Sequence, residues 1–365
     1  MKSGYLSAFA KLALSASALA AAVLFWLPVT RAADSNLSAG RKGTVEHIKV
    51  HGKSLEGNLE GDSADRDVFV YLPPSYSREP NRRYPVVYFL HGYGVEAERY
   101  WNLMAVPETA DRLSAAGTTH EMILVHPDAF TVYNGSMYSN SPTTGDWEDY
   151  IAQDLVSYID GHYRTIRDRS GRGLAGHSMG GYGTVRIGMK HPEVFSALYA
   201  MSSCCLMNNP QPGQGRGPGA RPNAETKAPE TKQGRGNIFA KAPLAQAAAW
   251  APDPMNPPQF FDSLEKDGQF QPMVAARYVA NSPLVMVDQY VPNLKRYHAI
   301  AMDVGLQDTL LSSNKDLDQA LVRLGITHSF ETYEGDHMNH VKDRFETKVL
   351  PFFSENLAAS SGRDH

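Results

Sequence analysis

From Tyr84 to Phe353 the chain alternates continuous apolar runs with segments of helical spacing, and this alternation restricts the available folds more than any other feature. The apolar runs are YPVVYFLHGYG, EMILVHPD, GRGLAG, SALYAM, YHAIAMDVG and HSFETYEG. The helical segments are 106–116, 148–163, 180–190, 312–324 and 341–353. Strands that are apolar throughout are typical of sheets buried on both faces, and repeated strand–helix units imply parallel strands. The sequence therefore predicts an α/β fold with a mostly parallel sheet and helices on both faces.

Two regions lie outside this alternation. In residues 45–52 and 67–72, apolar side chains either alternate with polar ones or follow one another without a break. This pattern predicts an antiparallel hairpin at the start of the sheet. Residues 208–237 are rich in Pro, Gly, Gln, Arg and Lys with almost no large apolar side chain, so we expect them to be disordered. Residues 238–278 are helical in places and are broken by APDPMNPP. We interpret the whole insertion as a cap or lid on the sheet.

The first 33 residues are typical of a secretory signal. Lys2 supplies a positive start, residues 12–27 are rich in alanine and leucine, and residues 28–33 end in small side chains. A retained membrane anchor is the alternative, but Lys11 and nearby serines shorten the unbroken apolar core. We expect cleavage that leaves residues 34–365 as one secreted or periplasmic domain without a stable membrane span.

The amino-acid composition argues against nucleic acid as a partner and against an ordinary disulfide. The chain has 365 residues, of which 42% are hydrophobic and 20% charged, an ordinary balance for a globular protein. A formal net charge of −4 provides no broad basic surface, so nucleic acid is not an expected partner. The two cysteines, Cys204 and Cys205, are adjacent and too close for an ordinary unstrained disulfide. A redox or metal pair is the alternative, but without a CxxC spacing we expect buried structural thiols.

The stretch GLAGHSMGGYGTV contains the pattern G-x-S-x-G around Ser178, between a predicted strand and a predicted helix. Glycines flank a serine in this context because the turn is sharp and the following helix packs closely. The hydroxyl then lies at the carboxyl end of the sheet, where open α/β folds bind ligands. We interpret Ser178 as a nucleophile, and an ordinary glycine-rich turn is the alternative.

A serine nucleophile needs a base and an orienting carboxylate, which in hydrolases of this topology follow in the order acid, then histidine. Asp303 ends an apolar strand and Asp308 lies in the loop beyond it, and we favour Asp308 because it has the reach to meet a histidine. His337 follows the last strand and is the predicted base, with His340 as its rival.

The developing negative charge on a reacting carbonyl requires backbone donors. We predict that the N–H groups of Met179 and Tyr93 form this oxyanion hole, with Gly92 as the next choice after Tyr93. The carboxylates and histidines at 336–343 also resemble a set of metal ligands, but they lack the H-E-x-x-H arrangement. We therefore expect no metal and no organic cofactor.

The segments YFLHGYG, DWEDYIAQDLVSYIDGHYRT, GLAGHSMGGYG, VGLQD and YEGDHMNHV, in this order, resemble the esterase D/feruloyl esterase group of α/β hydrolases. That group includes S-formylglutathione hydrolases, enterochelin esterases and mycolyltransferases of the antigen 85 type. The resemblance spans residues 45–353 and implies an α/β-hydrolase catalytic domain with Ser178 as nucleophile, Asp308 as acid and His337 as base. It does not transfer a substrate, because the insertion falls where such enzymes shape their pocket.

These observations predict a serine carboxylic-ester hydrolase that acts on a small-molecule or polysaccharide-linked ester through an acyl-enzyme. Two alternatives stay open. The same triad serves an acyltransferase whose acceptor is a sugar or lipid alcohol, and a binding protein can keep the fold without catalysis. Tyr133, Tyr138 and Trp147 precede the long helix and are predicted near the entrance, where they stack on a substrate ring or pack on the sheet.

Overall fold

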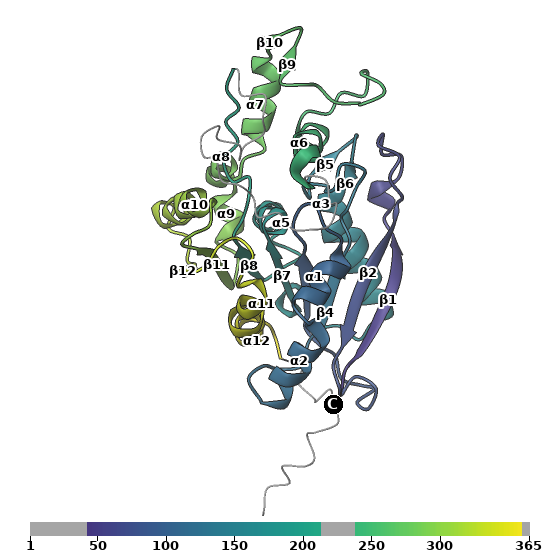
Figure 1. The fold of residues 1–365 in the computed structure, drawn as a ribbon. Helices are drawn as coiled ribbons and strands as arrows, with labels where there is room; N and C mark the ends of the chain where they lie inside the picture. Colours follow the sequence, from purple (N-terminus) through teal and green to yellow (C-terminus); the bar gives the residue numbers. More distant parts are fainter. Residues whose placement is uncertain (1–41, 213–237, 360–365) are drawn as a thin grey trace, which may run out of the picture. The chain divides into compact units, whose positions relative to one another are not determined.

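The computed structural model describes residues 42–212 and 238–359. The predicted signal at 1–33 and residues 213–237 of the predicted insertion lie outside this part of the chain. Within it, Figure 1 shows a central sheet with the helices packed around it. The predicted α/β architecture is confirmed, and its details follow from the pairing of the strands.

The central sheet has eight strands in the order β1-β2-β4-β3-β7-β8-β11-β12. β1 pairs antiparallel with β2, as the sequence predicts, and β2 pairs antiparallel with β4. Every later pairing in the sheet is parallel, so the carboxyl ends of β3, β7, β8, β11 and β12 share one edge. The strands are β1 Thr44–His51, β2 Asp65–Leu72, β3 Val86–Leu90, β4 Ile123–Pro127, β7 Arg172–His177, β8 Ala197–Met201, β11 Ala299–Gly305 and β12 Ser329–Tyr333.

Helices occupy the connections between the strands, as the helical spacing predicts. A π-helical stretch joins α3 to α4, and a second π-helical stretch joins α11 to α12, so each pair of helices is continuous. The helices are α1 Ala97–Leu103, α2 Val106–Ala115, α3 Trp147–Asp149, α4 Val156–His162, α5 Met179–Lys190, α6 Ala242–Trp250, α7 Pro272–Ala280, α8 Pro283–Met286, α9 Val291–Leu294, α10 Leu311–Arg323, α11 Val341–Arg344 and α12 Leu350–Asn356.

Both faces of the sheet are buried, which explains why its strands are apolar throughout. Successive side chains of a strand point to opposite faces. In β3, Val86, Tyr88 and Leu90 enter a core that also contains side chains of α4, α5 and α10. Val87 and Phe89 enter a second core with side chains of α1, α2 and α12. The hydrophobic effect therefore fixes which helices cover which face.

The region after residue 237 contains α6, α7 and a short hairpin formed by β9 (Glu265–Lys266) and β10 (Gln269–Phe270). It is fastened to the domain by Trp250 of α6, which is buried and whose ring packs against Tyr182 of α5. The start of the predicted disordered insertion belongs to the fold, since Asn208 is buried and its N–H donates to the Ser282 hydroxyl over 2.8 Å. Among the described residues, no helix is long and apolar enough to cross a membrane.

Candidate active site

The parallel strands bring the predicted site residues to one edge of the sheet. Ser178 follows β7 directly, and Tyr93 follows β3, its neighbour in the sheet. Asp308 lies beyond the end of β11, and His337 lies beyond the end of the adjacent β12. Residues that are far apart in the sequence meet here because the carboxyl ends of these strands coincide.

Ser178 forms a sharp turn between β7 and α5. Its backbone has φ 58° and ψ −113°, a conformation that non-glycine residues rarely adopt and that costs about 1–3 kcal/mol. The surrounding structure holds this turn, because the Ser178 N–H donates to the carbonyl of Met201 over 3.0 Å. The Ser178 carbonyl in turn accepts hydrogen bonds from the N–H groups of Tyr182 and Cys204. The serine is thus presented at the positive end of the α5 dipole.

Close packing explains two of the glycines around the turn. A Cβ on Gly180 would lie 1.9 Å from the carbonyl oxygen of Leu90, so α5 approaches β3 more closely than any side chain permits. A Cβ on Gly92 would lie 2.3 Å from the Tyr100 hydroxyl and 3.4 Å from the Cβ of Ser178. The loop after β3 therefore passes directly beside the serine.

Ser178, His337 and Asp308 form a continuous hydrogen-bonded chain. The His337 Nε2 lies 2.9 Å from the Ser178 hydroxyl oxygen, and the His337 Nδ1 lies 2.8 Å from Asp308 Oδ2. A carboxylate only accepts, so Nδ1–H is the donor to Asp308 and Nε2 accepts from the serine hydroxyl. This is the tautomer that a general base for Ser178 requires.

Asp308 is held in place by a second contact. Its Oδ1 accepts the N–H of Leu310 over 2.9 Å at the turn that leads into α10. Its side chain is fully buried, whereas that of His337 is 30% exposed. Burial raises the pKa of Asp308, but the hydrogen bond and electrostatic attraction of the His337 ring, with the Leu310 N–H, more than offset this and leave the pKa below its usual value. The carboxylate is therefore ionised where it meets the ring.

The rival acid, Asp303, has a different set of partners. It is buried within β11, and its Oδ2 accepts hydrogen bonds from the Tyr199 hydroxyl at 2.8 Å and from Arg344 Nε at 2.9 Å. Burial raises the pKa of Asp303. Its contacts join β8, β11 and α11, which makes it a structural ion pair rather than a partner of His337.

The rival base, His340, also lies apart from the serine. It occupies the position before α11, and its Nδ1 lies 2.8 Å from the Asp343 carboxylate on the surface. His337 thus lies in the loop after β12, whereas His340 lies at the start of the helix.

The predicted oxyanion donors flank the serine. Met179 is the first residue of α5, and Tyr93 is held in the loop after β3 by the bond from its hydroxyl to the Tyr133 carbonyl. The two segments approach each other, because a Cβ on Gly135 would lie 2.7 Å from both Met179 Sδ and a ring carbon of Tyr93. In residues 42–212 and 238–359, neither the Tyr93 N–H nor the Met179 N–H has a hydrogen-bond acceptor. Within this part of the chain, both N–H groups are therefore free to bind a ligand.

Sequence reasoning missed two residues that support the base. His177, next to the serine, is buried, and its Nε2–H donates to the carbonyl oxygen of His337 over 2.8 Å. Its Nδ1 accepts from the Tyr100 hydroxyl at the same distance. Burial, with electrostatic repulsion from the neighbouring His337 ring, lowers the pKa of His177 to about 3, so the ring of His177 is neutral. The motif G-H-S-M-G was the only available signal, since both partners are distant in the sequence.

The aromatic residues of the 130–150 region do not line an entrance together. Tyr138 and Trp147 are completely buried in the core, so of the two roles that the sequence leaves open, packing holds for these rings and stacking on a substrate does not. Tyr138 donates to the His91 carbonyl, and Trp147 donates to the Thr144 carbonyl, which explains their burial. Tyr133 is half-buried and meets Phe261 edge to face.

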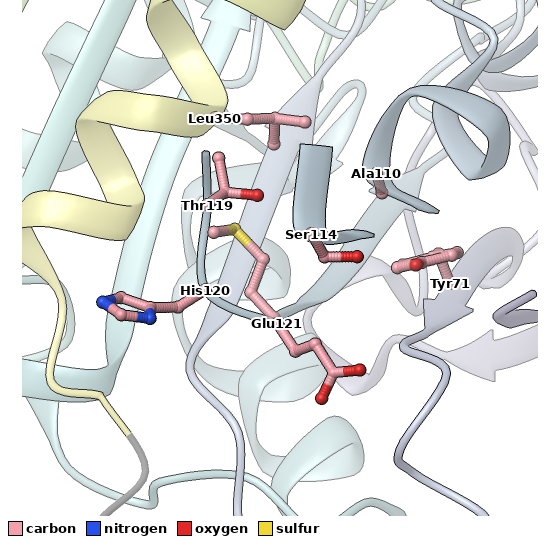
Figure 2. Close-up of a pocket in the computed structure, with 8 residues that line it drawn as sticks. Tyr71, Ala110, Ser114, Thr119, His120, Glu121 and Leu350 are labelled. Carbon is pink, nitrogen blue, oxygen red and sulfur yellow. The ribbon is translucent and has the colours of Figure 1, made fainter. Parts of the chain in front are cut away.

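A small pocket lies elsewhere on the domain. Figure 2 shows it between β2, α2, the segment before β4, and α12, with Tyr71, Ser114, His120 and Glu121 among its lining residues. Its volume of about 10 Å³ holds about one water, so it takes no organic substrate. Among the described residues, no group of three or more His, Cys, Asp or Glu is arranged to hold a metal ion.

The strand order and the serine turn at the carboxyl edge define an α/β-hydrolase fold. The Esterase family matches residues 63–347, and the chain belongs to this family. Among solved structures it is similar to a ferulic acid esterase, with a TM-score of 0.63 and 24% identity, covering 87% of this chain and 100% of that one. It is also similar to an S-formylglutathione hydrolase from Agrobacterium tumefaciens, with a TM-score of 0.56 and 18% identity, covering 87% and 97% of the two chains.

A curated relative supplies a closer match over a shorter stretch. The chain is 31% identical to an esterase of Mycobacterium tuberculosis over 140 residues. This stretch is 37% of this chain and 28% of the relative. The likeness therefore covers less than a third of the relative's length, and it carries no substrate to this chain.

Proposed function

We propose that this protein is a serine carboxylic-ester hydrolase that acts through an acyl-enzyme on Ser178. The observation that carries the proposal is the chain of contacts from Asp308 to His337 to Ser178, at 2.8 Å and 2.9 Å. Membership of the Esterase family supports it. A non-catalytic binding protein has no need to align these three groups.

In the proposed reaction, His337 Nε2 removes the hydroxyl proton as Ser178 Oγ attacks the ester carbonyl carbon. Asp308, which is ionised and buried, stabilises the imidazolium that forms and keeps its Nδ1–H oriented. The tetrahedral intermediate collapses when His337 returns the proton to the departing alcohol. A water molecule then attacks the acyl carbon, with the same histidine as base, and releases the acid and free Ser178.

We assign the stabilisation of the negative charge to the N–H groups of Met179 and Tyr93. Both are without an acceptor among the described residues, so neither has to break a protein contact before it binds the oxyanion. The α5 dipole adds to the field at the same point. Donors fixed in advance are the main source of electrostatic stabilisation in such sites.

The test compares the initial rate of hydrolysis of short-chain p-nitrophenyl esters by the full chain with that of Ser178→Ala. We expect the variant to lose roughly a thousandfold or more of kcat, as removal of a triad member does. His340→Gln is the matched control, because it removes a nearby histidine that does not contact the serine. Equal rates for the wild type and Ser178→Ala would overturn the proposal.

The acceptor in the second step is water in this proposal, and transfer to a sugar or lipid alcohol is the competing outcome. Product analysis with and without an added alcohol separates the two. Appreciable transfer at low alcohol concentration would replace the hydrolase assignment with an acyltransferase that uses the same three residues. The acyl-enzyme on Ser178 is common to both, and mass spectrometry of a rapidly quenched reaction detects it.

We also propose that the enzyme is exported and acts on a small-molecule or polysaccharide-linked ester outside the cytoplasm. The support is the charged and apolar pattern of residues 1–33. Expression of the full chain followed by sequencing of the N-terminus of the exported protein tests this. A new N-terminus after residue 32 or 33 is expected, and an uncleaved chain in the cytoplasm would contradict it.

A further inference from the structure

Cys204 and Cys205 lie in the loop after β8, and their side chains touch. The two Sγ atoms are 2.8 Å apart, so the thiols form a direct contact. The residues are half-buried rather than buried, which corrects the expectation of buried structural thiols. Cys205 has φ 58°, a left-handed conformation that few non-glycine residues adopt. The loop thus holds the two thiols face to face against the core.

This pair is joined directly to the proposed nucleophile. The N–H of Cys204 donates to the carbonyl oxygen of Ser178 over 3.1 Å. On the other side, Cys205 Sγ lies 3.9 Å from the amide nitrogen of Gln246 on α6. The Oε1 of Gln246 is buried and has no hydrogen-bond partner in the described part of the chain. The two cysteines therefore connect the serine turn with the helix that follows the insertion.

We propose that Cys204 and Cys205 form a redox-active vicinal dithiol, a modification site that closes reversibly to a disulfide and lowers activity at Ser178. The pairing partner is unambiguous, because the chain contains two cysteines only. The modification itself is independent of the proposed esterase function, and its effect on activity rests on that function.

The oxidant is a low-molecular-weight disulfide, which reacts with the two cysteines in two exchange steps. The thiolate of one cysteine attacks a sulfur of the reagent and releases one equivalent of reduced thiol, which leaves a mixed disulfide on the protein. The neighbouring thiol loses its proton and attacks the protein sulfur of that mixed disulfide, which releases a second equivalent. Two electrons pass from the cysteines to the reagent, and one intramolecular S–S bond forms.

The closed form is easily reduced again. Cα atoms joined by a trans peptide are about 3.8 Å apart, whereas ordinary disulfides span about 4.4–6.8 Å between Cα atoms. A bond between neighbouring residues is consequently strained, and strained disulfides are the labile ones. The hydrogen bond with Cys205 and burial raise the pKa of the Cys204 thiol, so we expect its oxidation to accelerate as the pH rises.

Closure affects the site through the backbone. Bringing the sulfurs from contact to bonding distance requires the Cys204 and Cys205 backbone to rotate, and the Cys204 N–H is one of the groups that hold the Ser178 carbonyl. Small displacements of a reacting group reduce turnover strongly. We expect a loss of tenfold to about a hundredfold in kcat in the oxidised enzyme.

The experiment uses the reduced full chain, incubated with glutathione disulfide and then unfolded in the presence of N-ethylmaleimide. Tryptic peptide 191–216 contains both cysteines and is analysed by mass spectrometry. The expected product has lost two hydrogen atoms and carries no maleimide, while ester hydrolysis falls and dithiothreitol restores it. The double variant Cys204→Ser, Cys205→Ser should show no response of its activity to the same oxidant.

The experiment tests disulfide formation and its effect on ester hydrolysis separately. Two maleimide adducts after oxidation, or glutathione adducts alone, would overturn the modification site. A disulfide with unchanged ester hydrolysis would overturn its coupling to Ser178. The mass measurement is repeated on Ser178→Ala, which has no proposed activity to lose, so disulfide formation there supports the site even where the proposed esterase function fails.

Discussion

The ring of His177 donates a hydrogen bond to the backbone carbonyl of His337 over 2.8 Å, so the residue before the proposed nucleophile positions the loop that carries the proposed base. The Tyr100 hydroxyl donates to the other ring nitrogen and fixes the tautomer that makes this contact. The serine turn and the histidine loop, which come from β7 and β12, are therefore tied together by a side chain that itself performs no chemistry.

His177→Leu tests this positioning role. It removes the donor to the His337 carbonyl and the acceptor of the Tyr100 hydroxyl, so we expect the free energy of unfolding to fall by about 1–3 kcal/mol. We also expect kcat to fall by tenfold to about a hundredfold, because the base is displaced. Urea unfolding and ester hydrolysis measure the two effects. Tyr100→Phe is the comparison, because it removes the bond that fixes the tautomer but leaves His177 beside the His337 carbonyl, so we expect a smaller loss of kcat than in His177→Leu. An equal loss of kcat in both variants would contradict the assignment.

The two aspartates near the site should respond differently to removal of their charge. Asp308→Asn should reduce kcat by about 10⁴-fold with little change in stability, because the histidine tautomer is lost. Asp303→Asn should destabilise the fold by about 1–3 kcal/mol, because it weakens the buried bonds to Tyr199 and Arg344 while Arg344 keeps its ion pair with Glu331. Thermal unfolding and activity per folded molecule distinguish them. The reverse pattern would make Asp303 the acid.

Gly180→Ala should disrupt the serine turn. The new Cβ would meet the backbone of Leu90 at 1.9 Å, so α5 must move and we expect a loss of at least about 1–3 kcal/mol in stability. The same substitution at Gly161, which lies exposed in α4 with no atom within 4 Å of the new Cβ, should stabilise the fold by about 0.5–1 kcal/mol. Parallel urea titrations compare them, and equal midpoints would refute the packing argument.

Two buried histidines should make the fold sensitive to acid. Burial and the charge of His91 lower the pKa of His126 to about 3, and burial with His337 lowers that of His177 to about 3. Their ordinary value is 6.5, so between pH 6.5 and 3 the unfolded chain binds protons that the folded chain does not. The contribution of the two neutral histidines to the free energy of unfolding is therefore fully present above pH 6.5. It decreases as the pH is lowered below 6.5, by up to about 1.4 kcal/mol per pH unit for each histidine.

His126→Phe isolates one of these contributions. Neither ring nitrogen of His126 has a hydrogen-bond partner among the described residues, and the ring stacks on Phe89 at 5.1 Å. The substitution removes a group that titrates in the unfolded chain. Below pH 6.5 the free energy of unfolding should therefore change less steeply with pH, by up to about 1.4 kcal/mol per pH unit. Urea unfolding at a series of pH values measures the slope. An unchanged slope would show that His126 does not carry it.

Much of the site could be predicted because its residues follow strands whose order and parallel pairing the apolar runs imply. Ser178 sits in a strand–turn–helix context, and His337 and Asp308 lie in loops after the last strands, so local pattern places each at the same edge. Whether Tyr138 and Trp147 lie in the core or at a substrate pocket could not be predicted in this way. An aromatic ring serves a substrate pocket and a core equally well, and burial by other segments decides between them.

The sequence by itself determined the fold class, the sharp turn at the serine and the order of nucleophile, acid and base, because hydrophobic period and glycine placement act over a few neighbouring residues. Only the tertiary structure decided which aspartate contacts His337, since Asp303 instead forms an ion pair with Arg344, 41 residues away. It also decided the role of His177, whose partner is 160 residues away. Hydrogen bonds between distant segments depend on how the strands are paired in space, and no local pattern records them.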